Sequence, residues 1–251
     1  MRTVEKSKMA GEGLCGSFEK AGEMKWRQLT NDVAVMSFPW HAFGIDFERN
    51  VWLLRLRDGR VAIHSSAPFT AEDITAIRRF GEPAWLVDAT LMHDTFAKDG
   101  RAAFPDLPYF APNGFARTSG IPIESLDSPP SEWKDEIDIL KLDGNRMKEH
   151  ALFHRPSATL VVADLFFSFP METRGWERFF VRHVMRLPRL FGISVFFRMT
   201  ISDRRAFARS MKALLQWNFE RVVVAHREPV EKEAKATVER ALGDSGFLSH
   251  A

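Results

Sequence analysis

The chain has 251 residues, with 35 Lys and Arg against 33 Asp and Glu, and its formal net charge at pH 7 is +2. Hydrophobic residues make up 45% and charged residues 27% of the sequence, a globular composition that excludes a wholly disordered chain. The single cysteine, Cys15, excludes an internal disulfide and a zinc cluster built on cysteines. No apolar run approaches the roughly 18 residues that cross a bilayer, and no hydrophobic signal core opens the chain, so we expect a soluble, cytoplasmic protein.

The first half of the chain predicts a leader followed by strands and one helix. Residues 1–25 are rich in Lys, Glu and Gly without an apolar period, so we expect a mobile leader and a single domain over 26–251. Strands are predicted at 33–38, 51–56, 61–64 and 84–87. Asp58-Gly59 predicts a two-residue type I′ hairpin loop. Thr70 and Asp73 form a capping box at the start of a helix that Gly81 ends.

The second half repeats this order. Residues 100–130, rich in Pro, Gly and Ser, are predicted to be mostly ordered loop. Strands are predicted at 137–142, 149–153, 159–163 and 221–225. Ser202 is the expected cap of one helix, and Pro229 and Gly243 are the expected start and end of the last. Hairpins combined with strand–helix alternation indicate an α/β (α+β) protein with two mixed sheets covered by helices, a four-layer αββα sandwich.

Polar residues that follow buried strands are the candidate site. They are His64, Asp88, His93, Asp164 and His226. Each also has an ordinary structural interpretation, since a lone histidine often packs in a core and an aspartate often caps a turn. Their recurrence in both halves favours a shared site beyond the strand ends.

Other kinds of site find no support in the sequence. No glycine-rich phosphate loop follows a strand, and there is no Gly-x-Ser-x-Gly elbow. His150 and His154 share one face of a predicted strand about 13 Å apart, too far for one metal, so we interpret both as structural.

Several segments together resemble the metallo-β-lactamase superfamily over residues 30 to 245. They are Asn50-Val-Trp-Leu-Leu-Arg-Leu56, Val161-Val-Ala-Asp-Leu-Phe166 and Val223-Val-Ala-His226, with Ile63-His-Ser-Ser-Ala-Pro68 and Phe153-His-Arg-Pro-Ser157 pointing to an uncharacterised branch. The resemblance implies an αββα sandwich with the site at the edge between the sheets.

The superfamily's metal motif is degenerate in this chain. Its His-x-His-x-Asp-His pattern falls on Asp88, Thr90, Met92 and His93, so only the last histidine is present. The next metal histidine would fall near Asn145, where the chain has none. The resemblance therefore implies that one of two metal positions has lost its ligands.

The remaining metal position would keep His93, Asp164 and His226, which we expect within one cluster of about 5 Å. One divalent metal (zinc, iron or manganese) or no metal at all is compatible with this set. His64 or Asp88 would orient a ligand or transfer a proton. The implied function is a mononuclear metal-dependent hydrolase of unknown substrate. The alternative is a non-catalytic binding or scaffold protein that kept the sandwich and lost the metal site, and redox chemistry at a mononuclear iron is a third option.

An arginine-rich region lies between Arg174 and Arg209, with nine arginines against two acids. Arg178, Arg182 and Arg186 are spaced four apart, and a helix ended by Pro188 would place them on one face. The opposite side would be apolar, formed by Trp176, Phe179, Phe180, Val184 and Leu187. This helix either covers the sheet edge or forms a surface for an anionic small-molecule substrate, an anionic lipid surface or a second subunit in a homodimer. Nucleic acid is not expected, because the stripe is short and the chain nearly neutral.

Overall fold

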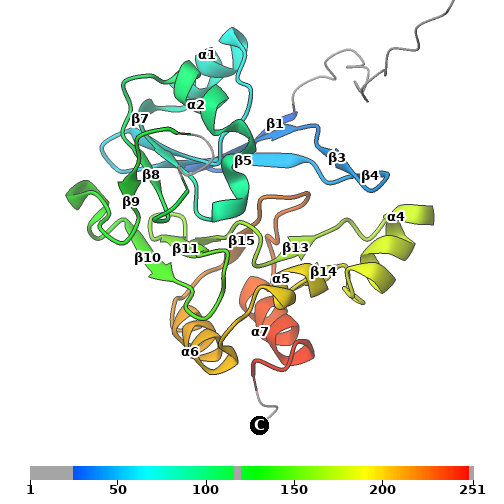
Figure 1. Cartoon of the computed structure of the whole chain (residues 1–251). Coiled ribbons are helices and arrows are strands. Elements are labelled where there is room, and N and C mark those ends of the chain that lie inside the picture. The colour runs from blue at the N-terminus through cyan, green and yellow to red at the C-terminus, as the bar shows by residue number, and fades with distance from the viewer. Residues whose placement is uncertain (1–24, 116–119, 249–251) are drawn as a thin grey trace, which may run out of the picture.

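The structure is a computed structural model that describes residues 25–115 and 120–248 (Figure 1). The predicted leader, with Cys15, lies outside the described residues apart from Lys25. The strands are β1 (Lys25–Thr30), β2 (Val33–Phe38), β3 (His41–Ala42), β4 (Ile45–Asp46), β5 (Arg49–Arg55), β6 (Arg60–His64), β7 (Glu82–Val87), β8 (Tyr109–Ala111), β9 (Glu124–Ser125), β10 (Ile137–Lys141), β11 (His150–His154), β12 (Thr159–Val161), β13 (Phe167–Ser168), β14 (Phe191–Gly192) and β15 (Arg221–Val223). The helices are α1 (Ala71–Phe80), α2 (Ala97–Ala103), α4 (Gly175–Phe179), α5 (Val195–Met199), α6 (Arg204–Leu214) and α7 (Ala234–Asp244), with the short turns η1 (Leu91–Phe96), η2 (Ser131–Trp133) and η3 (Phe180–Val184).

Two mixed sheets form the centre of the molecule. One has seven strands in the order β1-β2-β5-β6-β7-β8-β9, and the other has four in the order β10-β11-β12-β15. One apolar cluster fills the space between the sheets, a second lies between the seven-stranded sheet and α1 and α2, and a third lies between the four-stranded sheet and α6 and α7. Figure 1 shows the same helix pairs on opposite sides of the molecule. The predicted αββα sandwich is confirmed.

Period-two alternation in the central strands accounts for this layering. In β2, Val33 and Val35 face the other sheet, while Ala34 and Met36 face the helices. Successive side chains of a strand point to opposite faces, so a sheet buried on both faces needs a continuous apolar sequence. The strand prediction for 33–38 is confirmed.

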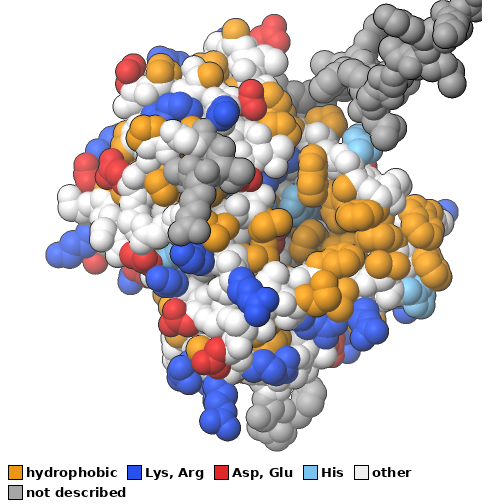
Figure 2. Space-filling model, viewed as in Figure 1, with side chains coloured by type: hydrophobic (Ala, Val, Ile, Leu, Met, Phe, Trp, Pro, Cys, Tyr) orange, Lys and Arg blue, Asp and Glu red, His pale blue; other side chains and the backbone are white. Residues whose placement is uncertain are grey.

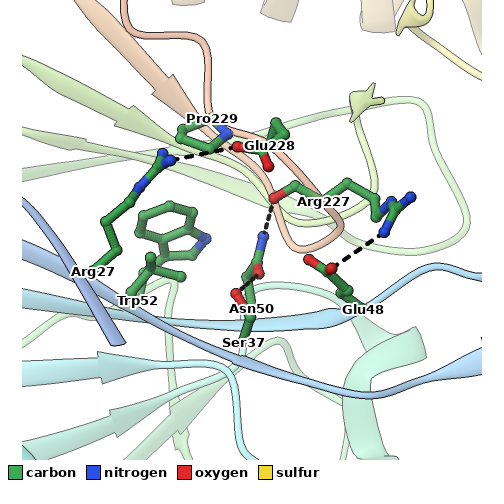
Figure 3. Close-up of a pocket in the computed structure, with 9 residues that line it drawn as sticks. Arg27, Ser37, Glu48, Asn50, Trp52, Arg227, Glu228 and Pro229 are labelled. Atoms are coloured by element: carbon green, nitrogen blue, oxygen red, sulfur yellow. Dashed lines mark hydrogen bonds and ion pairs between the residues drawn. The ribbon is translucent and has the colours of Figure 1, made fainter. Parts of the chain in front are cut away.

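Hydrogen bonds join the two sheets where β5 passes the end of β15. The backbone N–H of Asn50 donates to Ala225 O (2.8 Å), and its side-chain amide donates to Val224 O (3.1 Å) and Arg227 O (2.7 Å). The indole N–H of Trp52 also donates to Val224 O (2.8 Å). Figure 3 shows Asn50 reaching the Arg227 carbonyl beside Trp52. These bonds fix the chain on both sides of His226.

The predicted capping box of α1 is confirmed. The Thr70 hydroxyl accepts from the Asp73 N–H (3.2 Å), and the Asp73 carboxylate accepts from the Thr70 N–H (2.7 Å). Two backbone donors at the helix start are thereby satisfied. Gly81 ends the helix as expected.

The type I′ loop predicted at Asp58-Gly59 is wrong. Gly59 has a φ of +89°, but Asp58 is not among the positive-φ residues, and a type I′ turn needs positive φ at both central positions. Gly59 N–H donates to Leu56 O (2.9 Å) and Leu56 N–H donates to Arg60 O (2.8 Å), which closes a three-residue loop. The Asp58 carboxylate accepts a hydrogen bond from the backbone N–H of Arg60 (3.0 Å). Aspartate is common in turns because its side chain bonds the backbone two residues on, and this bond accounts for Asp58 in the loop.

The loop predicted over 100–130 contains strands. β8 pairs with β7 in parallel, and β9 pairs with β8. β8 is three residues long, too short for an alternating pattern, and Pro108 and Pro112 flank it. This strand brings Tyr109 next to the candidate site.

Two predicted helix starts are wrong. Asp203, not Ser202, caps α6, because its carboxylate accepts from Arg205 N–H and Ala206 N–H (2.9 and 3.0 Å). The last helix begins at Ala234 instead of Pro229, since Val230 pairs with Val222 as an extra bridge beside β15. Its predicted inward residues are buried: Ala234, Val238, Ala241 and Leu242.

The helix predicted through the arginine-rich region changes type halfway. α4 runs into the π-helical turn η3, in which Met185 N–H donates to Phe180 O (2.9 Å). A π turn shifts the register of every following side chain. On the predicted apolar side, Phe180 and Leu187 are buried, whereas Val184 at the end of η3 and Trp176 and Phe179 before it are exposed.

Among the described residues, none of the helices combines the length and the apolar character that a membrane span needs.

His150 and His154 both have hydrogen-bond partners, as their structural interpretation predicts. The Nε2 of His154 lies 3.1 Å from Arg55 O, which links the end of β11 to the end of β5 in the other sheet. Its Nδ1 lies 2.7 Å from Ser157 Oγ. Burial lowers the pKa of His154 to about 4.

We predict that His154 makes folding stability depend on pH between about 6.5 and 4. Because its folded pKa lies below its unfolded value, the unfolded chain binds the proton more tightly, and stability is lost as pH falls through this window. The loss approaches about 3 kcal/mol at pH 4. Urea unfolding of the parent and of His154→Gln at several pH values checks this. The stability difference between them should shrink as pH falls, and a constant difference would contradict the assignment.

Candidate metal centre

His93, Asp164 and His226 meet at the edge between the two sheets. His93 lies in η1 after β7, while Asp164 and His226 follow β12 and β15 of the other sheet. His93 Nε2 and His226 Nε2 lie 3.3 and 3.4 Å from Asp164 Oδ1. One potential ligand atom from each residue lies within 4.8 Å of the others, and all three residues are buried. The expected cluster is therefore present.

The ring of His226 is fixed in position. Its Nδ1–H donates to Glu48 O (2.7 Å), which directs Nε2 towards Asp164. Trp40 and Phe167 stack on the imidazole at centroid distances of 5.0 and 5.3 Å. A histidine whose other nitrogen donates to a carbonyl is typical of metal ligands, because the bond fixes the tautomer.

The ring of His93 is available in its neutral form. Burial and the neighbouring Arg49 charge together lower its pKa to about 4, against the opposing effect of Asp164. Its Nδ1 lies 3.5 Å from Ser65 Oγ. A neutral imidazole has a free lone pair for a metal ion.

Asp164 offers a carboxylate between the two rings. Burial by itself raises the pKa of Asp164, but His93 and His226 outweigh it and hold the pKa below its ordinary range. Two imidazoles and an ionised carboxylate form a donor set that suits a divalent metal. The residues present therefore fit one metal ion.

The buried carboxylate of Glu149 holds the segment that carries Asp164. It accepts the backbone N–H groups of Ala163, Asp164 and Leu165 at 3.0, 3.1 and 3.0 Å. Burial and the neighbouring Asp164 raise the pKa of Glu149 well above its ordinary value, and the three N–H donors oppose this effect. The sequence analysis did not identify this role. A glutamate at the start of an otherwise apolar buried strand is the signal that could have indicated it.

Asp88 lies outside the three-residue cluster, within a separate buried network. It accepts from the Tyr109 hydroxyl and from Ser66 Oγ (3.3 Å), and Arg49 Nη2 lies 3.5 Å from its other oxygen. Burial raises the pKa of Asp88 to about 6. Arg49 also donates to His93 O (3.4 Å), so it connects Asp88 to the cluster.

Arg49 is a second functional candidate that the sequence analysis missed. The guanidinium of Arg49 is buried and provides a positive charge beside Asp88. This charge opposes the effect of burial on the pKa of Asp88.

His64 also lies outside the cluster. It is fully buried, and neither of its ring nitrogens has a hydrogen-bond partner in the part of the chain that the structure describes. Burial, together with the smaller effects of His93 and Arg49, lowers the pKa of His64 to about 3. The ring is therefore neutral at ordinary pH.

An apolar pocket of about 300 Å³ opens at the cluster, and Asp164 and His226 lie in its wall. Its other lining residues are mostly aromatic or aliphatic, among them Trp40, Phe47 and Met147. Among the described residues, neither Lys nor Arg lines this pocket. Figure 2 shows the apolar side chains gathered around a hollow on this face. The pocket is suited to an uncharged, apolar group.

Comparisons with known proteins identify the fold. No protein-family model matches the chain, and no curated protein matches its sequence. Among solved structures, a metallo-β-lactamase from Erythrobacter litoralis has a TM-score of 0.62 at 13% identity, covering 92% of this chain and 99% of its own. The metallo-β-lactamase FIM-1 from Pseudomonas aeruginosa, in a mono-zinc form, has a TM-score of 0.60 at 12% identity over the same shares. The chain therefore has the metallo-β-lactamase fold.

We predict that Glu149→Gln loosens the segment around Asp164. The amide that replaces one carboxylate oxygen cannot accept a backbone N–H, which leaves a buried donor unpaired at a cost of about 1–3 kcal/mol. Hydrogen exchange should show faster exchange at Ala163–Leu165. In Glu136→Gln, the matched control, the lost bond is a single exposed one to Arg57 N–H (2.8 Å). Unchanged protection at Asp164 in Glu149→Gln would refute the role of this carboxylate.

Proposed function

We propose that this protein is a mononuclear metal-dependent hydrolase, with His93, Asp164 and His226 as the metal ligands. The observation that supports it is the convergence of their ligand atoms within 4.8 Å beside an apolar pocket. When bound, a divalent metal supplies Lewis acidity, which polarises a carbonyl or ester oxygen and activates water. Zinc, iron and manganese all accept this donor set.

The chain's own residues have separate tasks in this proposal. Glu48 O orients His226, and Glu149 holds the Asp164 backbone. Asp88 acts through Arg49 as a positioning residue for His93. The role of His64 as an orienting or proton-transfer group stays a prediction.

The substrate that the pocket favours is apolar near the reacting group. Aromatic and methionine side chains exclude water from the region beside Asp164, which strengthens electrostatic interactions there. An anionic substrate stays a prediction. The Lys and Arg side chains that would pair with its charge lie outside this pocket among the described residues. The cytoplasmic location and the homodimer likewise stay predictions.

A non-catalytic binding protein is the second candidate. It is favoured by Asp88, Thr90 and Met92 standing at positions where the superfamily pattern has metal ligands. Met92 is exposed, and the Thr90 hydroxyl donates to Met147 O (3.3 Å), so neither adds to the donor set. In this alternative the apolar pocket binds a ligand without converting it.

Elemental analysis of protein purified without chelator tests the proposal. We predict one divalent metal per chain in the parent, and loss of this metal in His226→Ala and Asp164→Asn, because the set is reduced to two ligands. His41→Ala, which removes an exposed histidine elsewhere, is the matched control and should retain the metal.

Hydrolysis of apolar aryl and alkyl esters is measured on the same proteins. Activity that disappears together with the metal supports the hydrolase. A bound metal without hydrolysis favours the binding protein, and a parent protein that takes up no metal would overturn the proposed site.

A further inference from the structure

An exposed apolar surface surrounds the mouth of the pocket. We define the rim patch as Phe43, Met92, Trp176, Phe179 and Phe196, of which Phe43 is 70% and Trp176 55% exposed. Three of its members, Phe43, Met92 and Phe196, also line the pocket. Figure 2 shows this region as the main gathering of apolar side chains on the face in view. A continuous apolar surface of this kind marks an interaction site.

Ring contacts join α4 and η3 to Phe43, which follows β3, and to Phe196 of α5, whose ring centroid lies 6.4 Å from that of Phe180. Trp176 lies against Phe179 at a centroid distance of 5.7 Å, and the buried Phe180 stacks on Phe43 at 5.6 Å. The Trp176 indole N–H donates to Phe43 O (3.0 Å). These rings are therefore positioned by packing while their outer faces remain exposed.

A hollow lined by arginines lies on the flank of the same elements. One cavity of about 340 Å³ is lined by three arginines: Arg182 in η3, Arg186 just after η3, and Arg198 in α5. The acid in this hollow, Asp244, pairs with Arg189 instead (3.0 Å). In the described ranges, no ion pair includes Arg182, Arg186 or Arg198.

These charges are uncompensated within the described fold. Arg198 Nε is buried without a hydrogen-bond partner there. Burial lowers the pKa of Arg198, and the charges of Arg186 and Arg204 lower it further, which indicates mutual repulsion. An anion in the hollow would relieve it.

We propose that the rim patch and Arg182, Arg186 and Arg198 dock this protein onto an anionic lipid bilayer. The aromatic side chains lie at the boundary between headgroups and acyl chains, and the arginines contact lipid phosphates. The mouth of the apolar pocket then faces the acyl chains. Docking of this kind is separate from the proposed hydrolysis and needs no metal.

Charge and pocket chemistry favour a bilayer over other occupants. A second copy related by a two-fold axis would bury both copies of the same surface in one interface, which would then contain the unpaired arginines of both chains without added acids. A free anion in the hollow would pair with its arginines, but the apolar side chains of the rim patch would remain exposed to water. An anionic bilayer covers both surfaces and continues into the pocket.

Co-sedimentation with phosphatidylcholine vesicles, with and without phosphatidylglycerol, tests the docking. We predict binding to the mixed vesicles that weakens as salt is raised. The triple variant Arg182→Gln, Arg186→Gln, Arg198→Gln should lower the partition coefficient about a hundredfold. Three exposed arginines on other elements provide a matched control with the same charge change, Arg57→Gln, Arg78→Gln, Arg79→Gln, which should bind as the parent does.

The apolar part is tested separately with Trp176→Ser combined with Phe179→Ser. The control is Trp26→Ser, which changes a partly exposed tryptophan on β1. Only the first should lose vesicle binding. Equal vesicle binding by the parent and the triple arginine variant would overturn the proposal. So would glycerol phosphate binding without vesicle binding, or a dimer in analytical ultracentrifugation that Trp176→Ser and Phe179→Ser dissociate. These readouts measure binding alone, so their failure is distinguishable from failure of the hydrolase proposal.

Discussion

The carboxylate of Glu149 accepts three consecutive backbone N–H groups, and the geometry of the candidate site depends on this contact. A buried carboxylate is costly unless several donors surround it, and here the donors belong to the segment that follows β12. Asp164 is the central residue of that segment. The Asp164 side chain therefore points to the edge between the sheets. The imidazoles of His93 and His226, which follow β7 and β15, contact it there.

Hydrogen bonds between the two sheets fix the positions of the His93 and His226 imidazoles relative to each other. Asn50 and Trp52 on β5 donate to carbonyls at the end of β15, so His226 keeps a fixed position relative to the seven-stranded sheet that carries His93. The site is therefore assembled across a layer boundary, where neither sheet alone has the three donors. Arg49 contacts both Asp88 and the backbone oxygen of His93, so it connects the network around Asp88 to the cluster.

Much of the fold could be predicted from the sequence, because most elements are long enough to show the hydrophobic period of a strand or a helix. The strand at 33–38 and the helix from Thr70 have enough residues to show their period, and both are as predicted. β8 has three residues between prolines and shows no period, so it was missed. The π turn η3 interrupts the helical period on which the prediction for this region rests, and Trp176 and Phe179 of the predicted apolar side, which lie before it in α4, are exposed.

The residues of the candidate cluster were among the five polar residues that follow buried strands, and the resemblance to the superfamily selected these three, but the residues that hold them were not predicted. Glu149 and Arg49 act through contacts with residues 14 and 44 positions away, which no local pattern encodes. X-ray absorption spectroscopy of the zinc-loaded protein tests the central claim most directly. The account predicts nitrogen and oxygen neighbours at about 2.0–2.1 Å with the outer-shell signature of two imidazoles and no sulfur. A sulfur neighbour, or a signature of one imidazole or none, would contradict it.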